Sequence, residues 1–174
     1  LSQSAASALG RKTDQLIVDV LDAGSNSNNV VHGSAGLTLA KALTVYENFG
    51  EADVPDDGQR YFVVSPAGWA DLLQIDQFSR AEYIGEKELP YAGGMTAKRW
   101  LGFLWFSFSG LSISSTTRDC HAYHRSSVGL AMGSDIRTEV NYIPEKVSNL
   151  ITSYMSMGAV MIDNEGAIEC QITE

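Results

Sequence analysis

The sequence predicts an α+β fold, with helices in the first half of the chain and strands in the second. Three observations lead to this fold class. Residues 2–23 have the periodicity of one long amphipathic helix. Residues 61–64 are an apolar run, typical of a buried strand, that passes directly into a second helical pattern. Residues 136–142 alternate between apolar and polar side chains, as a strand with one buried face does.

The first helix is predicted from residues that recur at steps of three and four along one face. They are Leu9, Thr13, Leu16, Ile17, Val20 and Leu21. Charged residues such as Arg11 and Asp14 lie off this face, and Gly24 is typical of the residue that ends a helix. The polar residues 25–29 then predict a loop, which we interpret as a boundary between two parts of the chain.

A second helix is predicted to follow Thr38, whose side chain can cap it, and to end at Gly50. Its apolar side consists of Leu39, Ala42, Leu43 and Tyr46. Residues 51–59 contain Pro55 and an Asp-Asp-Gly sequence, which is typical of a connecting loop.

Ser65 follows the strand at 61–64 and takes the N-cap position of a third helix. Pro66 stands at the first helical position, where the missing N–H of proline costs no hydrogen bond. The residues that should pack this helix against the strand are Trp69, Leu72 and Leu73. Residues 74–94 show no clear period and predict a long polar loop.

The second half of the chain is predicted to be mostly strand. The aromatic run at 100–108 indicates a central strand, and residues 120–132 indicate a strand or a pair of strands. Residues 136–142 indicate a half-buried strand. Residues 157–172 indicate a closing hairpin, because a turn sequence at 163–166 separates two apolar runs.

Residues 147–155 fit two patterns. Val147, Leu150, Ile151 and Tyr154 have helical spacing, and Pro144 is a suitable first residue for such a helix. The same segment also alternates as a strand would. Local periodicity by itself favours the helix.

The composition places limits on function. Hydrophobic residues make up 44% and charged residues 19% of 174, which is typical of a globular chain. The net charge of -9 argues against tight binding to a nucleic-acid backbone or to an anionic membrane. No apolar run reaches the roughly 20 residues of a membrane span, and the N-terminus does not resemble a signal peptide. The chain does not begin with Met, from which we expect it to be part of a longer product.

Ser65 is the first candidate for chemistry, because a serine between a strand and a helix is where many hydrolases hold their nucleophile. A nucleophile elbow requires small residues on both sides of the serine, whereas Val63 and Pro66 stand here. Proline also lacks the N–H that would help to form an oxyanion hole. We therefore expect Ser65 to cap a helix and not to catalyse a reaction.

A metal site was considered around His121 and His124, with Cys120 or Asp119 as a further ligand. On a strand, however, two histidines three residues apart point to opposite faces. His32 and Cys170 are isolated in the sequence, so no second ligand pair exists at zinc spacing. We expect structural roles for the histidines and no metal or other cofactor. Two cysteines without a secretory signal favour reduced thiols in a cytoplasmic protein.

Two further patterns do not support chemistry. The glycine-containing segment 32–38 lacks the Gly-Lys-Ser/Thr ending of a phosphate loop, and Lys41 lies inside the next helix. The acidic residues are expected to be solvated in loops. They are Glu51, Asp53, Asp56, Asp57, Glu86 and Glu88. The sequence therefore predicts no catalytic, cofactor-binding or metal-ligating residue.

The order of these elements resembles the major capsid proteins of tailed phages, with the Hong Kong phage-type fold, and most closely a podovirus-like branch. The segments that carry the resemblance are 9–17, 60–73, 101–103, 120–131 and 157–166. Residues 9–17 resemble the spine helix of that family, and residues 60–73 the strand and helix that open its axial domain. The family's N-terminal arm and extended loop, which precede the spine helix, have no counterpart in the sequence.

The resemblance implies three parts: residues 1–34 as the spine helix of a peripheral domain, 35–135 as an α/β axial domain, and 136–174 as returning strands of the peripheral domain. It also implies that residues 147–155 form a strand beside the spine helix, which we follow over the local periodicity.

The resemblance further implies a structural protein, not an enzyme, that self-assembles into the icosahedral shell around a phage genome. The implied partners are copies of the chain in hexamers and pentamers, together with scaffolding and portal proteins; packaged DNA would meet the inner wall only nonspecifically, and no membrane is involved. The implied location is the virion, and the host cytoplasm during assembly. The alternatives are a soluble α/β domain and a serine- or metal-dependent hydrolase.

Overall fold

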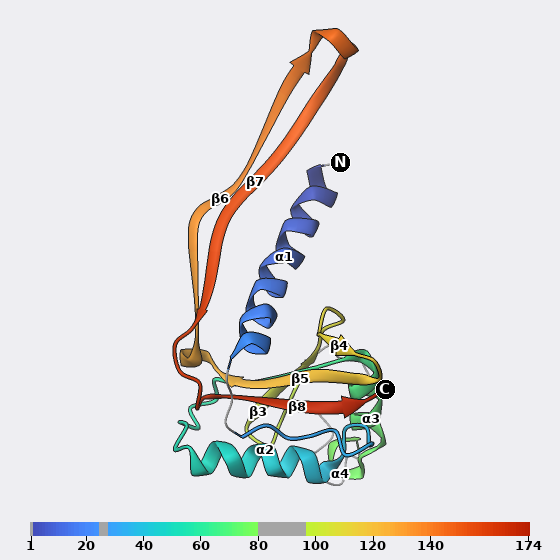
Figure 1. Ribbon diagram of the computed structural model, residues 1–174, viewed down its shortest axis with the longest axis vertical. Helices are drawn as coiled ribbons and strands as arrows, with labels where there is room; N and C mark the ends of the chain where they lie inside the picture. The colour runs from blue at the N-terminus through green and yellow to red at the C-terminus, as the bar shows by residue number, and fades with distance from the viewer. Residues whose placement is uncertain (1, 25–27, 80–96) are drawn as a thin grey trace.

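A computed structural model describes residues 2–24, 28–79 and 97–174. It consists of a body built on one mixed sheet and of a long β-hairpin that projects away from this body (Figure 1). The first helix lies beside the hairpin and reaches the body with its C-terminal end (Figure 1). The predicted α+β class is confirmed.

The helix bounds agree closely with the prediction, but the predicted apolar side of the second helix was partly wrong, because Leu43 and Tyr46 are exposed and Val45 and Phe49 are buried instead. The helices are α1 (Ser2–Ala23), α2 (Leu39–Glu51), α3 (Pro66–Gln74) and the short α4 (Asp76–Ser79). Thr38 caps α2, because its side-chain oxygen accepts a hydrogen bond from the Lys41 N–H at 3.4 Å. The prediction of a loop over 74–94 was wrong at its beginning, where α3 ends and α4 forms; residues 80–94 lie outside the described part of the chain.

The body sheet has the strand order β2-β3-β1-β5-β4, with β8 also paired to β5. Its strands are β1 (Arg60–Val64), β2 (Ala97–Trp100), β3 (Phe103–Ser107), β4 (Ile113–Ser114), β5 (Thr117–His124) and β8 (Ala167–Thr173). β1 runs parallel to β3 and antiparallel to β5, so the sheet is mixed. As predicted, the segment 61–64 is a buried strand.

The predicted single strand over 100–108 was wrong. Trp100 ends β2 and Phe103 begins β3, and the two strands pair as an antiparallel hairpin. Leu101 and Gly102 form the turn with φ values of 50° and 77°. Positive φ at both turn residues matches the twist of a hairpin, and leucine rarely adopts it, so the apolar run concealed the turn.

The projecting hairpin is a separate two-stranded sheet of β6 (Val128–Ile143) and β7 (Ser148–Met161). A short helical turn over Pro144–Lys146 connects the two strands. It is followed by Val147, which adopts the left-handed conformation with φ 48°. Residues 148–155 are therefore strand, as the family resemblance implied and local periodicity did not. The predicted strand or pair over 120–132 is confirmed as the end of β5 and the beginning of β6.

Two other strand predictions require correction. Residues 136–142 are in a strand, but no residue of this segment is buried in the chain. Residues 157–172 are not a hairpin, because β7 pairs with β6 whereas β8 pairs with β5. The turn sequence at 163–166 instead carries the chain from one sheet to the other. A turn motif specifies a change of direction, but it does not specify which strand becomes the partner.

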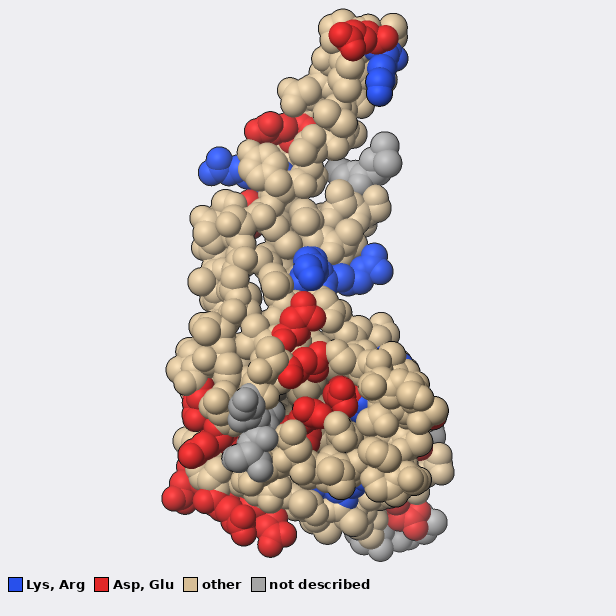
Figure 2. Space-filling view, viewed as in Figure 1, with Lys and Arg blue, Asp and Glu red and all other residues tan. Residues whose placement is uncertain are grey.

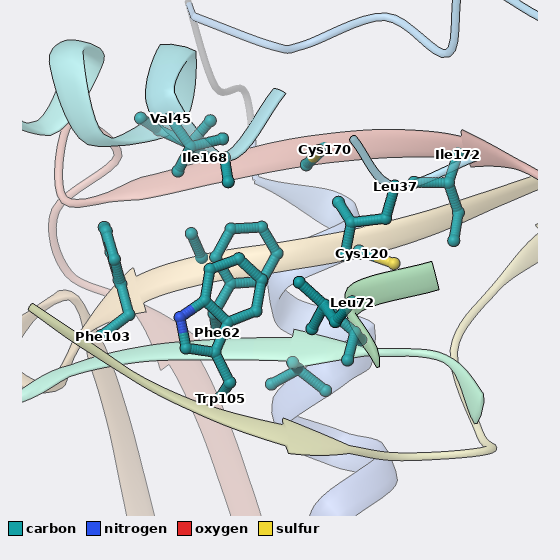
Figure 3. Packing of buried hydrophobic residues seen from close by; sticks show 14 of the residues in the cluster. Leu37, Val45, Phe62, Leu72, Phe103, Trp105, Cys120, Ile168, Cys170 and Ile172 are labelled. Carbon is teal, nitrogen blue, oxygen red and sulfur yellow. The ribbon is translucent and has the colours of Figure 1, made fainter. Parts of the chain in front are cut away.

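The core lies between the body sheet and helices α2 and α3 (Figure 3). At its centre Phe62 of β1 and Trp105 of β3 stack with ring centroids 4.0 Å apart, and Phe103 packs on Phe62 edge-to-face. Helix α1 covers the opposite face through Val18 and Leu21, both buried. The sheet therefore has an apolar layer on each side.

Three cations are buried in the body and are held by backbone carbonyls. The Lys41 ammonium donates to the carbonyls of Ala35, Gly36 and Gln171 at 2.7, 2.9 and 3.1 Å. Arg60 donates to the Pro55 carbonyl at 3.0 Å and to that of Val54, and Lys98 donates to the Phe78 carbonyl. These three of the 12 basic residues therefore add little positive charge to the described surface of the body.

Replacing Ser65 by Ala should lower the free energy of unfolding by about 1 kcal/mol, because the Ser65 hydroxyl accepts a hydrogen bond from the Gly68 N–H at 3.0 Å. Urea denaturation followed by circular dichroism measures this loss. Ser109→Ala, at an exposed position, is the matched control and should leave stability nearly unchanged. Equal stabilities of the two variants would contradict the capping role.

Cys120 and Cys170 lie directly opposite each other on β5 and β8 and are free thiols, both buried (Figure 3). Burial raises the pKa of both, that of Cys170 to about 12. We expect iodoacetamide at pH 8 to modify neither thiol in the native chain and both in urea, as measured by mass spectrometry. If Cys120 and Cys170 become alkylated in urea only after a reductant is added, they form a disulfide, which would contradict the predicted reduced state.

Candidate assembly surface

The serine, histidines and cysteine considered for chemistry do not assemble into a catalytic or metal site. The Ser65 hydroxyl is buried and caps α3. His121 Nε2 lies 2.6 Å from Asp22 on α1, whereas His124 Nε2 lies 3.1 Å from Asp57 in the loop before β1. The two histidines thus hold different parts of the fold together. Within the described residues, no three His, Cys, Asp or Glu side chains are placed so that they could hold a metal ion.

The remaining candidates are also engaged or separated. The Lys41 ammonium donates to three backbone carbonyls, two of them in the 32–38 segment itself, so it serves to hold this segment in the fold. His32 Nδ1 accepts a hydrogen bond from the Ser34 N–H at 3.0 Å. The hydrogen bond from His124 lowers the pKa of Asp57. Glu51, Asp53 and Asp56 are exposed, as predicted, and Glu86 and Glu88 lie outside the described residues.

The feature that the sequence analysis missed is an apolar surface on the projecting hairpin. Most of the large exposed hydrophobic side chains of the described chain lie there. They are Leu130, Met132, Ile136, Val140, Tyr142, Val147, Leu150, Ile151, Tyr154 and Val160. Val140 is 63% and Tyr142 60% exposed, although alternation predicted that these residues face a core. An exposed apolar surface of this extent is typical of an interaction site.

The strand register shows that one face of the hairpin is the more apolar. Residues directly opposite in an antiparallel pair share a face. The opposed pairs on this face are Val128 with Met161, Leu130 with Ala159, Met132 with Met157, and Val140 with Ile151. We call it the apolar hairpin face.

Helix α1 covers the apolar hairpin face only in part. It contacts β7 more extensively than β6. Between the N-terminal half of α1 and the distal part of β7 a groove of about 620 Å³ remains open. It is lined by Ser4, Ala5, Ala8 and Leu9 of α1 and by Asn149, Ile151 and Ser153 of β7. The β6 side of the face therefore stays uncovered within one chain.

The hairpin also leaves backbone groups without partners. Within the described residues β6 and β7 pair only with each other, so both are edge strands. A two-stranded sheet is at best marginally stable alone in water, and open edges promote pairing with another chain. Charged residues of both signs lie toward the distal end of the hairpin, whereas acidic side chains dominate the visible face of the body (Figure 2). These properties indicate a surface for protein association.

None of the described helices is both long enough and apolar enough to cross a membrane. The apolar surface on the hairpin is the main candidate for function among the described residues.

Solved structures from two phages and a virus-like particle have the same arrangement. A structure of Mycobacterium phage Che8 matches with a TM-score of 0.75 at 20% identity, over 97% of this chain and 61% of that one. The capsid of cyanophage P-SCSP1u matches with a TM-score of 0.72 at 17% identity, over 99% and 66%. The virus-like particle from Pyrococcus furiosus matches with a TM-score of 0.60 at 11% identity, over 94% and 64%.

The chain thus spans about three fifths to two thirds of the length of these structural relatives. At such identities the likeness establishes the fold, which is the predicted capsid-subunit fold. No curated protein matches the sequence. The family model described as "Phage capsid protein" matches residues 1–174. This model covers the entire sequence and agrees with the predicted structural, non-enzymatic role, so the chain belongs to the phage capsid protein family.

Proposed function

We propose that this chain forms the shell-building part of a major capsid subunit and that it associates with copies of itself through the projecting hairpin. The observation that carries the proposal is the apolar hairpin face, which one chain leaves uncovered. A neighbouring copy that covers it would remove apolar area from water and satisfy the open strand edges. Membership of the phage capsid protein family supports a copy of the chain as the partner and the virion as the location.

We propose the same division into domains that the sequence analysis predicted, with residues 1–34 and 136–174 in a peripheral domain and 35–135 in an axial domain. Contacts of α1 with β6 and β7 support the peripheral part. The two parts interleave at their boundaries, because β6 begins at Val128 and β8 is paired with β5 in the body sheet. Limited proteolysis of the isolated chain tests the division.

Three finer assignments are also proposals. We propose a podovirus-like branch of the family, which is supported by the resemblance of residues 9–17 and 60–73 to that branch. We further propose scaffolding and portal proteins as partners during assembly, because a shell of many identical chains needs a defined starting point and curvature. An acidic surface, finally, supports only nonspecific contact with packaged DNA.

The association surface is tested by replacing Val140 and Tyr142 together by Thr, which keeps the preference for strand and removes apolar area. We expect each contact between copies to weaken by about 2 kcal/mol, roughly 30-fold, because both side chains are mostly exposed in the single chain. The chain is expressed within its complete coding sequence, and particles are quantified by sedimentation and electron microscopy.

The matched control is Ile113→Thr on β4, an exposed strand residue of the body. This control should assemble as the unchanged chain does, and both variants should melt at about the same temperature as the unchanged chain. Shells formed in equal yield by the double variant and the control would overturn the role of the hairpin face.

A further inference from the structure

Helix α1 is attached to the body near its C-terminal end by two partly buried polar contacts of Asp22. Asp22 Oδ1 lies 2.6 Å from His121 Nε2, and Asp22 Oδ2 accepts a hydrogen bond from the Ser112 hydroxyl. The His121 side chain on β5 is only 1% exposed. Because α1 also lies along β7, these contacts help to hold the projecting hairpin at its place on the body.

Carboxylates surround His121 on several sides. Asp22 approaches it from α1, Glu169 stands directly opposite it on β8, and Asp119 lies two residues earlier on the same face of β5. The facing residue of β1 is Val63, which is apolar. Within the described residues no lysine or arginine forms an ion pair with these three acids. Acidic side chains gather where the lower end of α1 meets the body (Figure 2).

Two buried atoms in this cluster lack a hydrogen-bond partner, Asp119 Oδ1 and His121 Nδ1. A carboxylate can only accept hydrogen bonds, and a buried acceptor without a donor is costly. A proton on Asp119 would change one of its oxygens from an acceptor into a donor.

We propose that the cluster of Asp22, Asp119, His121 and Glu169 is a proton-controlled joint, in which uptake of a proton tightens the attachment of α1 to the body sheet and loss of the proton loosens it. The proton would sit on Asp119, turn one of its oxygens into a donor, and reduce repulsion among the three carboxylates. This inference concerns the chain itself and does not rest on its assembly into a shell.

The direction of the pH dependence follows from the two aspartates. Burial, and then the charge of Glu169, raise the pKa of Asp119, so the folded chain gains stability as the pH falls through that pKa. Burial alone would raise the pKa of Asp22, but the hydrogen bonds from His121 and Ser112 outweigh it and lower the pKa below 3.8. The Asp22 contribution is therefore present above 3.8 and is lost only in stronger acid. The joint should be tightest in mildly acidic solution.

Amide hydrogen exchange of the full chain tests the joint. Protection factors, corrected for the intrinsic effect of pH, are compared between pH 8 and pH 5 for amides of α1 and α2. We expect protection in the last two turns of α1 to be higher at pH 5 than at pH 8, because the pKa of Asp119 is raised in the folded chain, and protection in α2 to stay constant. Asp119→Asn should remove this rise, and Asp22→Asn should lower protection in α1 at both pH values.

The matched control is Asp19→Asn, because Asp19 also lies on α1 but its carboxylate pairs with Lys12 and Gln15 of the same helix. It should keep the wild-type pH profile. Loss of protection in α2 would reveal that Asp119→Asn does not fold. In that case the pH dependence of α1 protection is measured in Glu169→Gln instead. A wild-type pH profile in the folded Asp119 or Glu169 variant, or unchanged α1 protection in Asp22→Asn, would overturn the proposal.

Discussion

A sheet of only two strands has two open edges and two open faces, and the hairpin of β6 and β7 is such a sheet. Helix α1 covers only part of one face, so apolar residues such as Val140 and Tyr142 remain in contact with water. The described residues therefore leave the burial of the hairpin incomplete, and contact with another molecule would complete it. The body and helix α1 hold this incompletely buried hairpin in place.

The body supplies a rigid base for the hairpin. Its sheet has apolar layers on both faces, and the stacked rings of Phe62 and Trp105 join the two parallel strands at its centre. Buried Lys41, Arg60 and Lys98 bind backbone carbonyls that loops and helix ends would otherwise leave unpaired. These cations thus act as internal hydrogen-bond donors, and a mainly acidic surface remains, which opposes nonspecific association of the body.

The residues that the sequence offered as candidates for catalysis or metal binding have structural roles. Ser65 caps a helix, His124 connects β5 to the loop before β1, and His121 connects β5 to α1. The two histidine contacts join segments that are far apart in the sequence. A functional surface without catalytic groups is what a shell-forming protein requires, because its task is performed by contact area.

The sequence by itself determined the features that depend on neighbouring residues. Thr38 and the pair Ser65 and Pro66 set the beginnings of two helices, because capping acts within one turn. The amphipathic period determined α1, and the absence of flanking small residues excluded a nucleophile at Ser65. The family resemblance, carried by the order of these elements, also correctly favoured strand over helix at 148–155.

The tertiary structure decided what depends on distant partners. It placed β8 beside β5 and not β7, left the alternating residues 136–142 uncovered, and brought Asp22 to His121 across 99 positions of sequence. Alternation shows that a strand has an apolar face, but it does not show whether the same chain or another copy covers that face. Pairing and burial are properties of the assembled surfaces, and local sequence does not encode them separately.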